Sequence, residues 1–161
     1  MGKTTVSSPL PLPRWLAAAG LAVAALLPVL DAAAELDPRS VEFKTPADIR
    51  WVRNAEGTSE RAILFGDPDK PGPYVARIKW LPGHFSRPHV HANDRFFTVI
   101  SGTWWVGTGE KYDPASTVPV PAGSYVLHKG GQVHYDGAKD EETIIQVVGI
   151  GPVDTRQVGP R

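Results

Sequence analysis

The sequence predicts an all-β fold, arranged as a small β-barrel or jelly roll. Glycine and proline are frequent, with 16 of each in the 161-residue chain, and they show no collagen period. Short runs rich in valine, isoleucine and aromatic residues lie between the turns that these residues favour. No segment beyond residue 34 offers a long apolar period of 3.6 residues, so we expect antiparallel strands that close into a barrel.

Six runs are expected to form strands, each bounded by turn residues. Within residues 74–81, two sets of side chains alternate, as expected for a strand: Ala76, Ile78 and Trp80 against Val75, Arg77 and Lys79. Residues 35–44 are expected to form an extended arm ahead of the strands. The six expected strands are residues 62–65, 74–81, 96–101, 103–106, 125–128 and 143–150.

The first 34 residues have the pattern of a signal peptide. A weakly basic start precedes the apolar run 15–30, and Ala32 and Ala34 supply the small residues of a cleavage site. The alternative is an uncleaved membrane anchor, but the run contains Pro28 and is shorter than the roughly 20 apolar residues that a spanning helix needs. We therefore expect cleavage after Ala34, one domain over residues 35–161, a periplasmic or secreted location and no stable membrane insertion.

Composition excludes several classes of function. A formal net charge of +0 provides no basic surface for nucleic acid. The absence of cysteine excludes a disulfide scaffold, a cysteine-based zinc site and a thiol nucleophile. The sequence also contains no nucleophile elbow, phosphate-binding loop or dinucleotide fingerprint. Any chemistry should therefore come from a metal pocket that binds a small-molecule ligand, and a homodimer formed through edge strands is a further possibility.

All five histidines lie between positions 84 and 134. His89 and His91 are two residues apart, so in an extended chain their side chains point to the same face. Two neutral imidazoles on one face can bind one metal ion, and His134 is the obvious third ligand. The alternative is that His89 and His91 are ordinary surface histidines.

Two segments resemble the motifs of the cupin superfamily. The first cupin motif reads glycine, five residues, His-X-His, three residues, glutamate, six residues, glycine, and residues 83–102 match it at Gly83, His89, His91 and Gly102. The second reads glycine, five residues, proline, one residue, glycine, two residues, histidine, and residues 123–134 match it at Gly123, Gly131 and His134 but have Lys129 at the proline position. The chain also resembles a ChrR-like branch of small exported cupins.

This resemblance implies a cupin-type barrel of six to eight strands that holds one divalent transition metal. His89, His91 and His134 would be its imidazole ligands, and the four matching glycines would form tight turns. A protein that folds after export cannot select its metal inside the cell, so intrinsic affinity favours zinc or copper, with iron, nickel or manganese as the other candidates.

Arg95 occupies the position of the family's metal-binding glutamate, and a guanidinium cannot coordinate a cation. Three interpretations follow, in order of preference. The site has three histidines, and Arg95 binds an anionic substrate; or Asp94 supplies the missing carboxylate; or the site binds no metal. Gln146, in an apolar strand, is a second candidate for substrate binding.

The remaining histidines are expected at less central places. We expect His84 at the rim of the site and His128 facing solvent. The sequence thus predicts an exported metal-binding cupin, with oxygenase, isomerase and hydrolase chemistry on a small oxygenated or carboxylated molecule as the enzymatic possibilities. The alternative is a non-catalytic cupin that binds or senses a small molecule. No catalytic residue is assigned.

Overall fold

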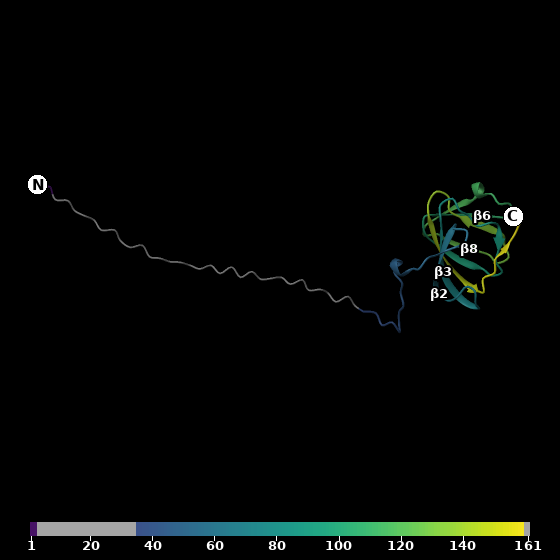
Figure 1. The fold of residues 1–161 in the computed structure, drawn as a ribbon, viewed down its shortest axis with the longest axis horizontal. Coiled ribbons are helices and arrows are strands. Elements are labelled where there is room, and N and C mark those ends of the chain that lie inside the picture. The colour runs from purple at the N-terminus through teal and green to yellow at the C-terminus, as the bar shows by residue number, and fades with distance from the viewer. Residues whose placement is uncertain (3–34, 160–161) are drawn as a thin grey trace. The chain divides into compact units, whose positions relative to one another are not determined.

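A computed structural model of the chain describes residues 1–2 and 35–159 (Figure 1). The predicted signal peptide lies outside these residues apart from its first two positions, so the cleavage site and the location stay predictions. No helix within the described ranges is long and apolar enough to cross a membrane. Contacts divide the chain after Val41, and the strands of the described residues all lie in the unit that begins at Glu42.

Short strands make up most of this unit, together with two single-turn 3-10 helices at Pro46–Asp48 and Pro114–Ser116. The strands are β1 (Val52–Arg53), β2 (Ser59–Phe65), β3 (Gly72–Trp80), β4 (His89–Val90), β5 (Arg95–Ser101), β6 (Thr103–Thr108), β7 (Val118–Pro121), β8 (Tyr125–His128), β9 (His134–Gly137), β10 (Thr143–Gly151) and β11 (Arg156–Gln157).

The strands form two antiparallel sheets, which confirms the all-β prediction. One sheet has the order β1-β2-β3-β10-β5-β8, and the other has the order β11-β4-β9-β6-β7. All six expected strands are present, with ends that differ by up to three residues from the expected ones. Five short strands (β1, β4, β7, β9 and β11) were not expected, because each has at most four residues and gives little periodicity to read.

The core lies between the inner faces of the sheets. β10 alternates in burial along its length, with Ile145 and Val147 buried, and β5 contributes Phe97 and Val99 to the same face. Trp104 from β6 in the second sheet is fully buried against them. Period-2 patterning of apolar residues thus positions the sheet that forms one wall of the site.

Gly102 illustrates how the glycines of the two sequence motifs act. Its φ is +72°, and a Cβ at this position would collide with the Glu142 carbonyl oxygen. Only glycine fits this close turn between β5 and β6 without strain. The expected positive φ is also found at Gly83, Gly123 and Gly131.

Candidate metal centre

Three histidines converge inside the barrel. His89 on β4 and His134 on β9 are direct register partners, and His91 follows immediately after β4. One nitrogen from each ring lies within 4.8 Å of the others, and all three side chains are buried. The ring centroids of His89 and His91 are 4.8 Å apart, and those of His89 and His134 are 4.5 Å apart. The predicted triad is therefore assembled, with the predicted third member.

Each of these rings is oriented by a backbone carbonyl. Nδ1 of His89 bonds the carbonyl of Arg87 at 2.7 Å, and Nδ1 of His134 bonds that of Gln132 at 3.1 Å. Nδ1 of His91 bonds the carbonyl of Asp154. A carbonyl only accepts, so Nδ1 carries the proton in all three rings and Nε2 keeps its lone pair. Metal-ligating histidines show this second bond almost invariably.

The C-terminal segment holds part of this arrangement in place. Besides accepting from His91, Asp154 accepts the Ala92 backbone N–H through its carboxylate at 2.8 Å. The next strand, β11, pairs with β4, where Gln157 is the register partner of His89. The orientation of the His-X-His segment therefore depends on residues more than sixty positions further along the chain.

The electrostatics favour the neutral form of His91 and His134. Burial, followed by the nearby Arg95 charge, lowers the pKa of His91 to about 3. Burial is also the main cause that lowers the pKa of His134 below its ordinary range, partly offset by Asp136. Neutral imidazole is the form that binds metals, so these rings are ready to act as ligands at neutral pH.

Arg95 lies beside the cluster, as the preferred interpretation requires. Its Nη2 donates toward Nε2 of His134 at 3.4 Å, and its guanidinium carbon is 5.2 Å from the centre of the Phe97 ring. Its Nε is buried and has no acceptor among the residues that the structure describes. Burial lowers the pKa of Arg95, and the charge of Asp136 opposes this shift. This cation is thus placed to bind an anion next to the histidines.

The structure does not bring Asp94 into the cluster. Its carboxylate is exposed and accepts the Gly130 backbone N–H at 2.7 Å, and it is not among the groups that could share an ion with the histidines. Asp94 thereby ties the start of β5 to the glycine turn that precedes β9. This bond gives Asp94 a structural role.

Gln146 also lies away from the cluster. It occupies a half-buried position of β10 that alternates with the buried Ile145 and Val147, so its side chain faces the outer side of the sheet. There its Oε1 accepts from Nε of Arg77 at 3.1 Å, and Arg77 is its register partner on β3. An outward-facing amide cannot line the interior site, which removes the reason for expecting it to bind substrate.

The expectation that His128 faces solvent is wrong. His128 is 6% exposed, stacks on Trp104 and lies 4.0 Å from His134 between ring centroids. Neither of its nitrogens has a partner among the described residues, and burial lowers its pKa to about 2. The error arose because β8 carries apolar residues on both faces: Tyr125 and Leu127 are the exposed ones.

Sequence analysis missed the contribution of Asp136. It lies two residues after His134 on β9 and belongs to a second group of possible ligands with His134 and His128. Its Oδ1 accepts the indole N–H of Trp104 at 3.1 Å. The period-2 rule that pairs His89 with His91 also applies to His134 and Asp136, and it could have identified this carboxylate.

A cavity of about 360 Å³ opens beside the cluster, within the size range of small-molecule sites. His89, His91 and Arg95 line it, together with Asp136. The arrangement provides three metal-binding nitrogens, one cation and space for a ligand. It lacks a carboxylate ligand at position 95.

Comparisons with known proteins agree with this architecture. Residues 40–154 match the model of the family described as the ChrR Cupin-like domain. No curated protein matches the chain.

Several solved structures share the fold. The polyketide cyclase RemF from Streptomyces resistomycificus is 16% identical, with a TM-score of 0.63 and coverage of 75% of this chain and 87% of that one. An uncharacterized conserved protein with a double-stranded β-helix domain from Klebsiella pneumoniae is 26% identical, with a TM-score of 0.51 and coverage of 66% and 90%. The DMSP lyase DddQ from Ruegeria pomeroyi is 14% identical, with a TM-score of 0.54 and coverage of 69% and 61%.

Proposed function

Because the chain belongs to the ChrR Cupin-like domain family, we propose that it is an exported metal-binding cupin that acts on a small oxygenated or carboxylated molecule. His89, His91 and His134 would hold one divalent transition metal. The observation that carries this proposal is the carbonyl bond at Nδ1 of every ring, which leaves three Nε2 lone pairs in one buried space. Nε2 of His134 has only the long contact with Arg95, Nε2 of His89 and of His91 have no donor among the described residues, and a cation would satisfy all three.

The donor set suits a transition metal of intermediate softness. Three imidazole nitrogens favour zinc, copper, iron or nickel over calcium or magnesium. Zinc or copper is our first choice, which follows from export before folding. A metal held here would polarise a ligand oxygen or activate bound water or dioxygen.

Arg95 would set the charge of the ligand. Its guanidinium is half-buried next to His134, and it can pair with a carboxylate or an enolate oxygen in the cavity. The names of two fold relatives, a polyketide cyclase and a DMSP lyase, support enzymatic use of this fold on small molecules. Fold likeness alone does not fix a reaction, and the proposal therefore ends at the substrate class.

A non-catalytic binding or sensing role is the second candidate. Asp136 is the carboxylate that lines the cavity, and its Oδ1 is bonded to Trp104. Among the described residues, this leaves Oδ2 of Asp136 as the one lining carboxylate oxygen without a protein partner, which limits the supply of general bases. Turnover of a bound ligand would favour the enzyme, and saturable binding without turnover would favour the sensor.

The metal content of the purified protein tests the proposal. The chain should be recovered from its native compartment without an affinity tag, and its metals measured by mass spectrometry. We expect about one transition-metal ion per chain, lost in His134→Ala and retained in the matched control Asp94→Ala. Protein that carries no metal after exposure to zinc, copper and ferrous ions would contradict the proposal, and loss in both variants would make Asp94 a ligand.

A further inference from the structure

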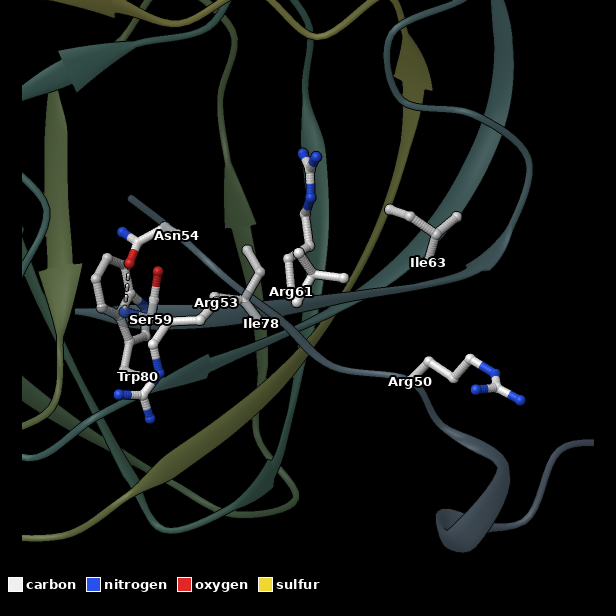
Figure 2. A pocket seen from close by; sticks show the side chains of 9 residues that line it. Arg50, Arg53, Asn54, Ser59, Arg61, Ile63, Ile78 and Trp80 are labelled. Carbon is white, nitrogen blue, oxygen red and sulfur yellow. Dashed lines mark hydrogen bonds between the residues drawn. The ribbon is translucent and has the colours of Figure 1, made fainter. Parts of the chain in front are cut away.

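The cavity beside the histidines continues onto the inner face of β2 and β3. A second hollow of about 620 Å³ lies there (Figure 2), and it shares four lining residues with the first: Asn54, Ser59, Ile78 and Trp80. The two hollows therefore meet. A ligand held at His89 has room to extend along the sheet toward β2.

The second hollow has an apolar floor that the other sheet does not cover. Ile63 on β2 is the register partner of the buried Ala76, which places it on the inner face, yet it is 41% exposed. Ile78 and Trp80 continue this floor toward the histidines. Exposed apolar surface on the inner face of a barrel is suited to binding an apolar part of a ligand.

Two buried hydrogen-bond donors along this path lack an acceptor within the described residues. They are the indole N–H of Trp80 and the Nε of Arg95. Trp80 lines both hollows, so its free donor lies where they meet. Asp136 is the one carboxylate that lines either hollow, and its Oδ1 is bonded to Trp104. The path therefore favours a ligand rich in acceptor oxygens and negative charge.

Arg61 differs from the other two arginines of the second hollow. Arg53 forms an ion pair with Glu60 at 3.0 Å, and Arg50 points away from the other labelled side chains (Figure 2). Arg61 lies opposite Ile78 on the inner face and has no ion-pair or hydrogen-bond partner within the described ranges. Burial raises the pKa of Tyr74, and both Arg95 and Arg61 oppose that shift, so the two cations act on the same part of the interior.

We propose that the ligand of this site is an extended organic acid with two oxygen-bearing ends. One end binds at the histidines beside Arg95, an apolar middle lies on Ile78 and Trp80, and a carboxylate at the far end pairs with Arg61. This inference rests on the proposed function, because the first end is assigned to the metal centre. The inference adds a second binding group, Arg61, which is separate from the histidine cluster.

Monohydroxamates of linear dicarboxylic acids are suitable probes. Their hydroxamate chelates zinc, their methylene chain is apolar, and their far carboxylate can be masked as a methyl ester without changing the chain. Binding of each acid and its ester to the zinc-loaded protein should be measured by calorimetry over two to six methylenes, because the series locates the span between the anchors. At the best length we expect the acid to bind about threefold to fivefold more tightly than its ester, as for a partly exposed ion pair.

Variants then assign this preference to one residue. Arg61→Gln should abolish the preference of the protein for acid over ester, and Arg61→Lys should retain part of it. Arg77→Gln, on the outer face of the same sheet, is the matched control and should leave the preference unchanged. Acetohydroxamate, which has no far end, should bind equally to the unmodified protein and to Arg61→Gln.

The outcomes separate the two proposals. A zinc-loaded protein that shows no acid preference at any length, or keeps that preference in Arg61→Gln, would overturn this inference alone. A protein that takes up neither zinc, copper nor ferrous ions would overturn both. This inference would also be overturned if the protein were a dimer that binds acid and ester equally and that dissociates in the Arg61→Gln variant. A second copy of the chain would then cover this face.

Discussion

Two neighbouring regions of the barrel interior are equally buried but differ in how their polar atoms are paired. In the core around Trp104, apolar side chains pack together, and the indole N–H finds the carboxylate of Asp136. In the cluster around His134, a backbone carbonyl orients each of the three rings through Nδ1. One nitrogen from each ring lies close to those of the other two rings. The first region stabilises the fold by itself, whereas the second leaves Nε2 of His89 and of His91 without a donor among the described residues.

The largest effect on stability is expected in the core. Trp104→Ala should lower the free energy of unfolding by about 3–5 kcal/mol, because it removes a fully buried ring and leaves Asp136 without its donor. Urea unfolding of the metal-free protein measures this. Phe65→Ala, at a site that is 61% exposed, is the control and should cost less than about 1 kcal/mol. Equal losses in the two variants would contradict the division into regions.

The next largest effect is expected in the cluster, and it concerns metal affinity. His89→Ala should weaken zinc binding more than about 100-fold, since even second contacts of metal ligands contribute about 10–100-fold. Its free energy of unfolding without metal should fall by only about 1 kcal/mol. A chelator competition titration and urea unfolding give the two values. If metal-free His89→Ala lost as much free energy of unfolding as Trp104→Ala, the cluster would be part of the stabilising core.

Acid should weaken the protein through its buried histidines. In the unfolded chain a histidine takes up a proton near pH 6.5, whereas burial lowers the pKa of His91 to about 3 and that of His128 to about 2. Between these values the unfolded state binds more protons, so the stability of the metal-free protein should fall as the pH drops from about 7 to about 4.

His128→Phe tests the part that one buried ring contributes to this fall. It removes an imidazole with no partner among the described residues, so stability at pH 7 should be kept. The dependence of stability on pH should become shallower by up to about 1.4 kcal/mol per pH unit. Urea midpoints at pH 7, 6, 5 and 4.5 measure this slope. The exposed His84→Phe is the control, and a slope unchanged in both would show that His128 does not titrate on unfolding.

The smallest effect is expected on the outer face of the sheet. Gln146→Ala removes one hydrogen bond to Arg77 and should change the free energy of unfolding by less than about 0.5 kcal/mol. Zinc affinity and hydroxamate binding should stay the same. A loss of ligand affinity in this variant would place Gln146 in the site after all.

Sequence periodicity was sufficient for the long strands and for the pairing of His89 with His91. β3 and β10 each have nine residues, and their alternation could be read directly. β4 has two residues and owes its existence to pairing with β9 and β11, which local sequence does not encode. His134 was predicted as the third ligand from the clustering of the histidines and then from the resemblance to the second cupin motif, since no local pattern connects residues forty-five positions apart.

The electrostatic surroundings of the site could not be read from the sequence. The carbonyls that orient the histidines belong to Arg87, Gln132 and Asp154, and they depend on the path of the backbone. His128 and Asp94 each had two possible directions, and long-range packing decided between them. No sequence pattern indicated that Arg61 lies on the inner face of the sheet, because an arginine in a strand commonly faces solvent.

The contacts of Asp154 and β11 with the His-X-His segment also have a consequence for the order of assembly. A chain that emerges with its N-terminus first presents His89 and His91 well before the residues that orient them. The last part of the domain to arrive is therefore the part that completes its binding centre. In a partly emerged chain these two histidines lack the contacts that orient them, so on the proposed function tight metal binding would begin only when β11 docks.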